Sequence, residues 1–402
     1  MALDMTTFAS ALKAHYTSDR VENMVYSDNP LLAMMPKYES FGGKNLPIPI
    51  IYGNPQGRSA TFATAQANKT NTQMKDFVLT RAKDYSLASI DNETLEASKG
   101  NSNAFMEAAT TEIDGAIHSA ARSLAIAMYG TGSGAIGQIS SASDVSNSDI
   151  ITLVNLEDIT NFEVGMSLKV SADNGGGSVR SGEVLVEAVD RDLGTVTVTT
   201  DWDDITGIAV LDYIFVEGDY DAKIKGLLAW LPSTAPSSTA FFGVDRTADV
   251  SRLGGIRFDG SAMPIEEALT KAASRAAREG AKPDYCFLNY SNYANLEVAL
   301  GSKVQYIDMK VNAEIAFRGI VINGPRGPIK VVPDQNCPSD RAFMLQMNVW
   351  KLYSLGKAPK ILDTDGLKML RDSSADSVEV RVGYYAQLGC RAPGYNVNIK
   401  LS

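Results

Sequence analysis

The residues in this sequence that most suggest chemistry are Gly132, Gly134 and Gly137, whose spacing matches the pattern G-x-G-x-x-G. In a nucleotide-binding site this motif follows a strand and opens a helix, so that backbone N–H groups and the helix N-terminus face the phosphates. Here a long helical pattern precedes the glycines and a polar, β-rich region follows them. The context argues against a nucleotide site and favours a flexible joint between two parts of the chain.

Two acidic segments contain the residue types of a calcium-binding loop. In the segment Asp201-Trp202-Asp203-Asp204, Thr206 stands where the sharp turn requires glycine, and the later bidentate glutamate is missing. The segment Asp363-Thr364-Asp365-Gly366 is only a fragment of such a loop. Turns with solvated carboxylates are favoured over loosely bound cations. The sequence therefore predicts no metal site and no cofactor.

Nucleophilic catalysis has few possible participants in this chain. Its two histidines are His15 and His118, and His118 lies beside the apolar stripe of a predicted helix, which favours a core or interface side chain. The three cysteines, Cys286, Cys337 and Cys390, are widely spaced and set mostly among apolar residues, so they predict reduced, inert thiols. Nothing marks a carboxylate pair among the 47 Asp and Glu residues. We predict no catalytic residues and no enzyme.

The bulk composition limits the classes of protein further. A chain of 402 residues exceeds what one hydrophobic core usually serves, so several domains are expected. The net charge of −10 argues against direct affinity for nucleic acid, which is bound through clustered Lys and Arg. No apolar run approaches the roughly 18 residues that span a bilayer, so no membrane association is expected. The first residues lack the pattern of a secretory signal, which predicts synthesis that ends in the cytoplasm.

The elements that would position any site can be predicted from residue spacing. Between residues 103 and 129, apolar residues recur every three or four positions, which predicts one stripe of a long helix. A helix of about 26 residues would be about 39 Å long. Asn103 can cap its start and Gly130 can end it. The stripe consists of Phe105, Ala109, Ile113, Ile117, Ala121, Leu124 and Met128.

Before this helix, residues 46–53 and 72–86 predict two extended segments, separated by a polar stretch that cannot bury itself. Such a two-stranded ribbon is marginal alone and needs a partner surface. After the helix, short β-branched runs separated by turns predict a small all-β domain between about residues 138 and 222.

The last third of the chain predicts alternating helices and strands. Residues 264–279 form the best-marked helix, with Pro264 at its start, acids in its first turn, bases in its last turn and Gly280 after its end. Residues 285–288 predict a buried strand. The strand leads into a helix that Ser291 caps and Gly301 ends.

This order of elements resembles the major capsid proteins of tailed bacteriophages, which have the Hong Kong 97-type shell fold. The long helix resembles the spine helix of that fold, and the helix 264–279, the strand-to-helix step at 284–300 and the final strands resemble its axial domain. The resemblance implies an α+β fold with a small inserted all-β domain. The implied parts are an N-terminal arm (1–42), an extended β loop (43–88), a peripheral domain with the spine helix (89–137), the inserted all-β domain (138–222), and the axial domain with the closing peripheral strands (223–402).

The resemblance also implies a function and partners. The chain would self-assemble as pentamers and hexamers into an icosahedral head that encloses DNA without binding it specifically. Arm and loop would lap neighbouring subunits, with inter-subunit contacts from Arg58, Phe62, Phe77 and Arg81, and Phe62 as the main anchor. Scaffolding, portal and decoration proteins are possible partners, and no large N-terminal scaffolding segment is expected to be fused and removed. The virion, assembled in the host cytoplasm, is the expected location. An encapsulin-like compartment shell is the first alternative, and an α/β enzyme is less favoured.

Overall fold

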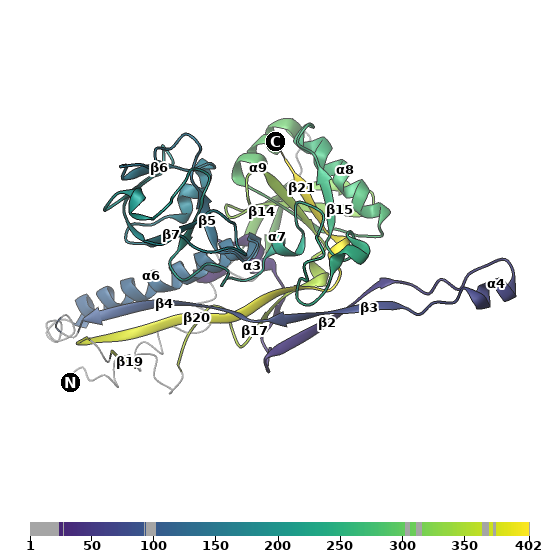
Figure 1. Cartoon of the computed structure of the whole chain (residues 1–402), viewed down its shortest axis with the longest axis horizontal. Helices are drawn as coiled ribbons and strands as arrows, with labels where there is room; N and C mark the ends of the chain where they lie inside the picture. Colours follow the sequence, from purple (N-terminus) through teal and green to yellow (C-terminus); the bar gives the residue numbers. More distant parts are fainter. Residues whose placement is uncertain are drawn as a thin grey trace. The chain divides into compact units, whose positions relative to one another are not determined.

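The computed structural model describes residues 24–26, 28–91, 93, 102–301, 306–310, 316–363, 370–372 and 375–401 (Figure 1). The chain divides into two compact units. Unit 1 comprises residues 1–125 and 230–402, and unit 2 comprises Ile126–Ala229. Each unit is described by itself.

The axial part of unit 1 is a seven-stranded mixed sheet with helices packed against it. Its central strand, β12 (Tyr285–Leu288), pairs in parallel with β15 (Gly327–Pro333) and antiparallel with β16 (Arg341–Leu345). The side chains of β12 are mostly buried, as predicted for the strand at 285–288. Helices α8 (Ile265–Arg278) and α9 (Tyr290–Leu300) contribute to the same apolar core. The strand order is β11 (Ile256–Asp259), β21 (Val397–Lys400), β16 (Arg341–Leu345), β12 (Tyr285–Leu288), β15 (Gly327–Pro333), β14 (Ala316–Gly324) and β13 (Tyr306–Lys310).

The ends of these two helices test the predicted capping residues. Helix α8 begins after Pro264 and ends at Arg278, and Gly280 has a φ of +91°, so its predicted boundaries are confirmed. Helix α9 ends at Gly301 as predicted. Its N-cap, however, is Asn289 rather than Ser291, because the Asn289 side chain accepts the N–H of Ser291.

The peripheral part of unit 1 is a second sheet with a long helix. Strand β20 (Ser377–Cys390) pairs with β4 (Ala82–Asp91) over ten residues, and β17 (Trp350–Ser354) pairs with its C-terminal end. Shorter strands β1 (Lys37–Tyr38), β18 (Lys360–Ile361) and β19 (Leu370–Arg371) complete this sheet. Figure 1 shows α6 running along β4 and β20.

Helix α6 spans Ser102–Tyr129, close to the predicted 103–129. The predicted stripe residues Ile113, Ile117, Ala121 and Leu124 are all buried. The side chains of Phe105 and Ala109 lie outside the described part of the chain. On the peripheral sheet, Asp84 Oδ2 accepts hydrogen bonds from the Ser123 hydroxyl at 2.6 Å and the Tyr384 hydroxyl at 3.3 Å, which ties the helix to both long strands.

The predicted extended loop is a two-stranded antiparallel hairpin of β2 (Asn45–Gly53) and β3 (Gln73–Thr80). Its two strands are joined by residues 54–72, which contain the short helix α4 (Phe62–Ala67) at the far end of the hairpin (Figure 1). Strand β3 continues through Arg81 into β4, so the hairpin and the peripheral sheet share one continuous segment of chain.

The N-terminal arm differs from expectation over the residues that are described. Helix α3 (Pro30–Met34) is buried apart from Met34, and the Leu31 N–H donates to Asp334 Oδ2 at 3.2 Å. The Leu352 N–H donates to the Pro36 carbonyl at 2.8 Å, and Phe41 is fully buried. Residues 29–35 and Phe41 therefore pack largely into their own chain, while residues 37–40 are exposed and their contact with a neighbour stays a prediction. Residues 1–23 lie outside the described part.

Unit 2 is a six-stranded antiparallel sheet with its own core, which includes Phe162, Leu168, Val170, Trp202 and Ile214. Two short 3-10 helices, Leu156–Asn161 and Trp202–Asp204, lie between its strands. The strand order is β5 (Ala135–Gln138), β10 (Tyr213–Val216), β7 (Ser167–Ser171), β8 (Val184–Asp190), β9 (Thr195–Val198) and β6 (Ile150–Thr152). Helix α7 (Leu227–Trp230) begins in unit 2 and ends at the first residue of unit 1's second segment.

In the G-x-G-x-x-G pattern, Gly132 and Gly134 lie between α6 and β5, and Gly137 lies within β5. Gly132 and Gly134 have φ values of +92° and +87°. A Cβ on Gly134 would meet the Asp219 carbonyl oxygen at 2.4 Å, and one on Gly132 would meet Lys225 Cγ at 2.8 Å. These glycines serve a tightly packed turn instead of the flexible joint that the sequence predicted.

Candidate assembly surface

The base of the hairpin is fixed to unit 1 by an aromatic cluster. Phe77 on β3 is fully buried, and its ring centroid lies 5.0 Å from that of Trp230 and 6.1 Å from that of Phe241. The rings of Trp230 and Trp350 are 6.3 Å apart, and the Trp230 indole N–H donates to the Leu388 carbonyl at 3.1 Å. Burial of large aromatic rings in offset and edge contacts stabilises such a cluster beyond the area buried.

A cation completes this cluster. The Arg246 guanidinium lies 4.2 Å from the centroid of the Phe241 ring and donates to the Trp230 carbonyl at 3.4 Å. Burial, together with the nearby Arg257, lowers the pKa of Arg246 to about 10. The group stays charged at neutral pH, so its contact with the ring face is a cation–π interaction.

Backbone and polar contacts hold both strands of the hairpin at its base. The Val78 N–H donates to the Phe242 carbonyl at 2.9 Å, and the Lys75 ammonium donates to the Asp245 carbonyl at 2.9 Å. Arg252 Nη1 donates to the Tyr52 carbonyl on the opposite strand at 2.5 Å. The hairpin is therefore anchored on both strands and does not depend on its own two-stranded ladder alone.

The free edge of β2 is poor in hydrogen-bond donors. Because the Val78 N–H points away from β2, its partner Pro47 occupies a pair without ladder hydrogen bonds, as does Pro49 two residues later. An N–H at either position would face outward, and proline has none. Prolines on an edge strand hinder the addition of another strand. The free edge of β2 is therefore poorly suited to strand addition.

The tip of the hairpin is exposed throughout, apart from half-buried Ala65. It has internal order, because the Gln56 N–H donates to Thr70 Oγ1 at 2.9 Å and the Thr61 hydroxyl donates to Thr64 Oγ1 at 2.7 Å. At the start of α4, the Phe62 side chain is 83% exposed. An ordered tip that presents an exposed aromatic ring has the features of a docking element.

A second apolar feature lies nearer the base. Ile51 and Met74 are directly paired across the hairpin and are 57% and 55% exposed. Directly opposed side chains in an antiparallel pair lie on the same face. Together they form an exposed apolar pair on the hairpin ladder, between residues Tyr52 and Lys75, which are both held by contacts to the rest of unit 1. The sequence analysis did not identify this pair, although two large apolar residues in a predicted two-stranded ribbon were the available signal.

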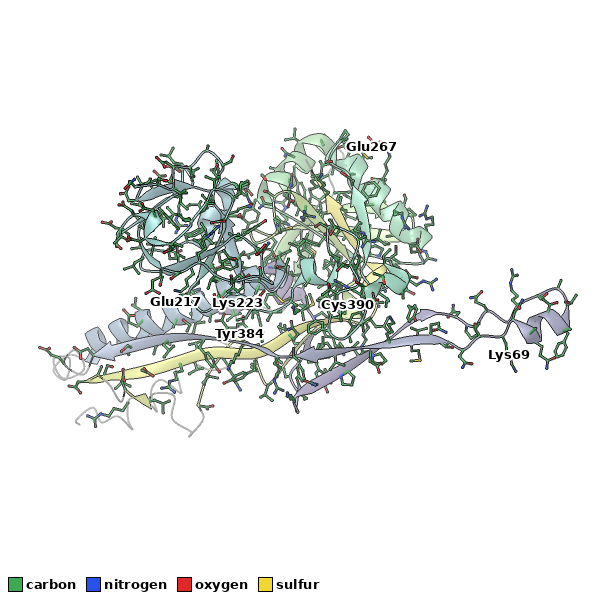
Figure 2. All side chains as sticks on the ribbon, viewed as in Figure 1. Lys69, Glu217, Lys223, Glu267, Tyr384 and Cys390 are labelled. Atoms are coloured by element: carbon green, nitrogen blue, oxygen red, sulfur yellow. The ribbon has the colours of Figure 1, made fainter. Side chains whose placement is uncertain are left out.

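The four predicted contact residues are placed differently. Arg58 and Phe62 are exposed at the tip, where they are free to meet a neighbour. Phe77 has no exposed surface and serves the hairpin base instead. Arg81 is half-buried and donates to the Phe41 carbonyl at 2.6 Å, with its guanidinium 4.8 Å from the Phe41 ring. The inter-subunit roles of Arg58, Phe62 and Arg81 stay predictions. Figure 2 shows Lys69 near the same far end of the hairpin.

The cysteines and histidines are the residues that could supply a nucleophile or a base. Cys286, Cys337 and Cys390 are buried free thiols, and burial raises the pKa of all three, that of Cys286 to about 12. His118 is exposed on α6, so the expectation of a core imidazole is wrong and an interface role stays a prediction. His15 lies outside the described residues.

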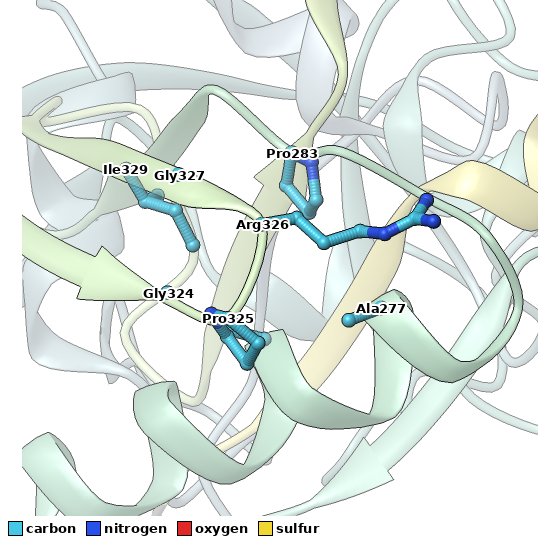
Figure 3. Close-up of a pocket in the computed structure, with 8 residues that line it drawn as sticks. Ala277, Pro283, Gly324, Pro325, Arg326, Gly327 and Ile329 are labelled. Atoms are coloured by element: carbon cyan, nitrogen blue, oxygen red, sulfur yellow. The ribbon is translucent and has the colours of Figure 1, made fainter.

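The predicted turn acids and a recess beside α8 are two further features of the described chain. Asp203 lies in a 3-10 turn and accepts the Asn147 N–H at 3.3 Å, while residues 364–369 lie outside the described part. Over the described ranges, no three His, Cys, Asp or Glu side chains are placed to hold a metal ion. A recess of about 180 Å³ beside α8 is lined mainly by small and apolar residues (Figure 3). Arg326 at its rim donates to the Gly280 carbonyl.

One further property concerns membranes. Within the described part of the chain, no helix is both long enough and apolar enough to cross a bilayer.

The architecture is similar to that of several capsid and particle proteins of known structure. The chain is similar to the capsid asymmetric unit of cyanophage A-1(L), with a TM-score of 0.51, 12% identity, and coverage of 93% of this chain and 92% of that chain. It is also similar to the capsid of the native GTA particle (TM-score 0.46, 8% identity, 92% and 89% covered) and to the virus-like particle from Pyrococcus furiosus (0.41, 9%, 95% and 96%). No curated protein matches this chain.

The first of these likenesses establishes a capsid fold of the Hong Kong 97 type, and the predicted α+β class is confirmed. Residues 212–376 match the family model described as the SU10 major capsid protein. The predicted resemblance to tailed-phage major capsid proteins is confirmed.

Proposed function

We propose that this chain is the major capsid protein of a tailed bacteriophage, whose copies form rings of five and six that close into an icosahedral head around DNA. The contacts within a ring are heterologous, because one surface of each subunit meets a different surface of the next. Such contacts close into a ring when the rotation between subunits permits it.

The observation that carries this proposal is the contrast between the two ends of the hairpin. Its base is held by Phe77, Trp230 and Arg252, while the residues of its tip are exposed in the isolated chain. An anchored base holds the tip in one orientation before it meets a partner. Less conformational entropy is then lost on docking, which favours assembly.

The exposed apolar groups on the hairpin supply the driving force. Phe62 at the tip and the pair Ile51–Met74 nearer the base are available to enter a neighbour's surface. Fully burying a side chain of this size contributes about 1.5–3 kcal/mol. Each copy presents the same hairpin, so a modest contribution is repeated around every ring and across the whole shell.

The finer assignments follow from this role. The chain is a structural subunit of the shell and not an enzyme, and the shell encloses DNA without binding a particular sequence. We propose that it assembles in the host cytoplasm and resides in the virion. Scaffolding, portal and decoration proteins are the expected partners of such a shell.

Electron microscopy and light-scattering mass of the chain, expressed alone and with its genomic neighbours, test the proposal. Closed shells, or rings of five and six, are the expected result. Shells that contain DNA support a phage head, whereas shells filled with protein cargo indicate an encapsulin-like compartment. A monodisperse monomer of 43.1 kDa under both conditions would overturn the proposal.

A further inference from the structure

The dipeptide Asn174–Gly175 in unit 2 is placed for a spontaneous reaction of the backbone. In an Asn-Gly pair the glycine nitrogen can attack the side-chain carbonyl carbon of the asparagine, because glycine has no side chain to obstruct the approach. Asn174 is exposed in the loop between β7 and β8, and Gly175 has a φ of +88°. Among the described residues, the Gly175 N–H has no hydrogen-bond partner. The attacking nitrogen is therefore not engaged elsewhere.

The side-chain carbonyl of Asn174 is held by a buried hydroxyl. Ser133 is buried, and its hydroxyl donates to Asn174 Oδ1 at 2.5 Å. Thr131 Oγ1 in turn donates to Ser133 Oγ at 3.0 Å, so the Ser133 proton is directed at the asparagine. When the side-chain carbon is attacked, negative charge develops on its oxygen, and a donor placed at that oxygen stabilises the charge as an oxyanion hole does.

The loop that carries this pair is fixed to the segment that holds the serine. The Gly176 N–H donates to Asp221 Oδ2 at 2.8 Å, and the Asp221 N–H donates to the Ser133 carbonyl at 2.7 Å. All of these residues belong to unit 2. The fold therefore holds Asn174 against its donor in one arrangement, and less ordering is needed before the attack.

The sequence contains a second Asn-Gly pair, Asn323–Gly324, in a different setting. Gly324 pairs with Gly327 at the closed end of the β14–β15 hairpin. Because Pro325 and Pro328 have no N–H, the pair Gly324–Gly327 is the one that exchanges backbone hydrogen bonds. The Gly324 nitrogen is thus held in the ladder, and this second pair is expected to be protected while the chain is folded.

We propose that Asn174–Gly175 is a modification site, at which the folded chain converts its own asparagine to aspartate and isoaspartate with Ser133 as hydrogen-bond donor. The Gly175 nitrogen gives its proton to hydroxide and forms a bond to Asn174 Cγ. The Cγ–Nδ2 bond then breaks, and the amide group takes up a proton from water and leaves as ammonia. Water opens the resulting cyclic imide at either carbonyl carbon, which gives aspartate or isoaspartate. This inference does not depend on the proposed function.

The modification changes the charge and the backbone of the loop. Both products place a carboxylate where a neutral amide stood, next to Asp173 in the sequence. The Asp221 carboxylate is also close, since a Cβ on Gly175 would meet Asp221 Oδ1 at 2.5 Å. Like charges this close destabilise one another, and isoaspartate adds a carbon atom to the main chain. We expect unit 2 of the modified chain to unfold at a lower temperature.

Timed incubation of the folded chain in mildly alkaline buffer tests the site. The chain is then digested at acidic pH, and the peptides are analysed by mass spectrometry and by enzymatic assay for isoaspartate. The peptide with Asn174 is expected to lose an amide and gain a hydroxyl over time, while the peptide with Asn323 stays unmodified. Both should react when the chain is incubated in denaturant. Equally slow reaction of the two asparagines in the folded chain would overturn the proposal.

Substitutions at Ser133 test the donor separately from the exposure of the loop. Ser133→Ala removes the hydroxyl and should slow the reaction of the folded chain about tenfold, whereas Ser133→Thr keeps a hydroxyl and should react at nearly the parent rate. In denaturant all three chains should react equally, since the donor acts only in the fold. Thermal unfolding verifies that each variant is folded. A folded Ser133→Ala chain that reacts as fast as the parent, or faster, would overturn the role of Ser133. Asn174→Gln is the control that should show no modification at this position.

Discussion

Replacing Phe62 with alanine separates the assembly role of the hairpin tip from the stability of the subunit. The Phe62 side chain is 83% exposed at the start of α4, so the folded subunit loses almost no buried area when it is truncated. We expect the free energy of unfolding of the unassembled subunit to change by less than about 0.5 kcal/mol.

The expected effect on assembly follows from the same exposed fraction. If a neighbour covers the ring, most of its surface is removed from water on assembly, which contributes about 2 kcal/mol per contact. A loss of that size raises the concentration needed for assembly roughly 30-fold. Phe62→Leu, which keeps much of the apolar area, is expected to have a smaller effect.

The assay is a concentration series in which shells are separated from free subunits by sedimentation, with thermal unfolding measured on the free subunits. Gln66→Ala on the same short helix is the matched control, since this exposed side chain carries no aromatic ring. The control should assemble like the parent. If Phe62→Ala assembles at the parent concentration, or if it unfolds several degrees lower, the reasoning about the tip is refuted.

Three other predictions concern the folded subunit. Phe77→Ala should destabilise it by about 3–5 kcal/mol, because a fully buried ring leaves the aromatic cluster; an unchanged midpoint in a denaturant titration would contradict this role. Asp212→Ala leaves Arg180 without its carboxylate partner in unit 2 and should lower the free energy of unfolding by about 3–5 kcal/mol, measured by calorimetry. A loss below about 1 kcal/mol, which is typical of an exposed ion pair, would contradict the interpretation of this pair as buried. The raised pKa of Cys286, about 12, keeps its thiol protonated at pH 8. Iodoacetamide should therefore modify the native chain slowly at that pH and all three cysteines rapidly after unfolding, and rapid native labelling would be inconsistent with the buried sites.

The elements that the sequence predicted best depend on residues close together in the chain. The ends of α8 depend on residues within the helix or next to it, such as Glu266, Arg278 and Gly280, so the sequence alone contains the information. The stripe of α6 is equally local, since its spacing reflects one buried helix face. The cap of α9 was misplaced by two residues because Asn289 and Ser291 are both good N-cap residues.

The less predictable features depend on residues distant in sequence. Whether Phe77 faces solvent or core is decided by Trp230 and Phe241, more than 150 residues away, and the alternation of β3 is the same in either case. The described part of the arm is held by Asp334 in the same way. Strands β16 and β17 follow each other closely in the sequence but belong to different sheets, a division that only tertiary structure determines.

The candidate assembly surface was predicted in outline and not in detail. An unusually polar stretch between two extended segments indicated a projecting loop, and Phe62 was recognisable as an isolated aromatic residue within it. The anchoring role of the loop base was not recognisable, because it needs the cluster around Trp230.

A three-dimensional electron-microscopy reconstruction of shells assembled from this chain tests the central claim most directly. The account predicts that helix α4 of each copy lies against a neighbouring subunit, with Phe62 covered by that neighbour. Shells in which the hairpin tip extends into solvent, or a chain that remains a 43.1-kDa monomer at every concentration tested, would contradict it.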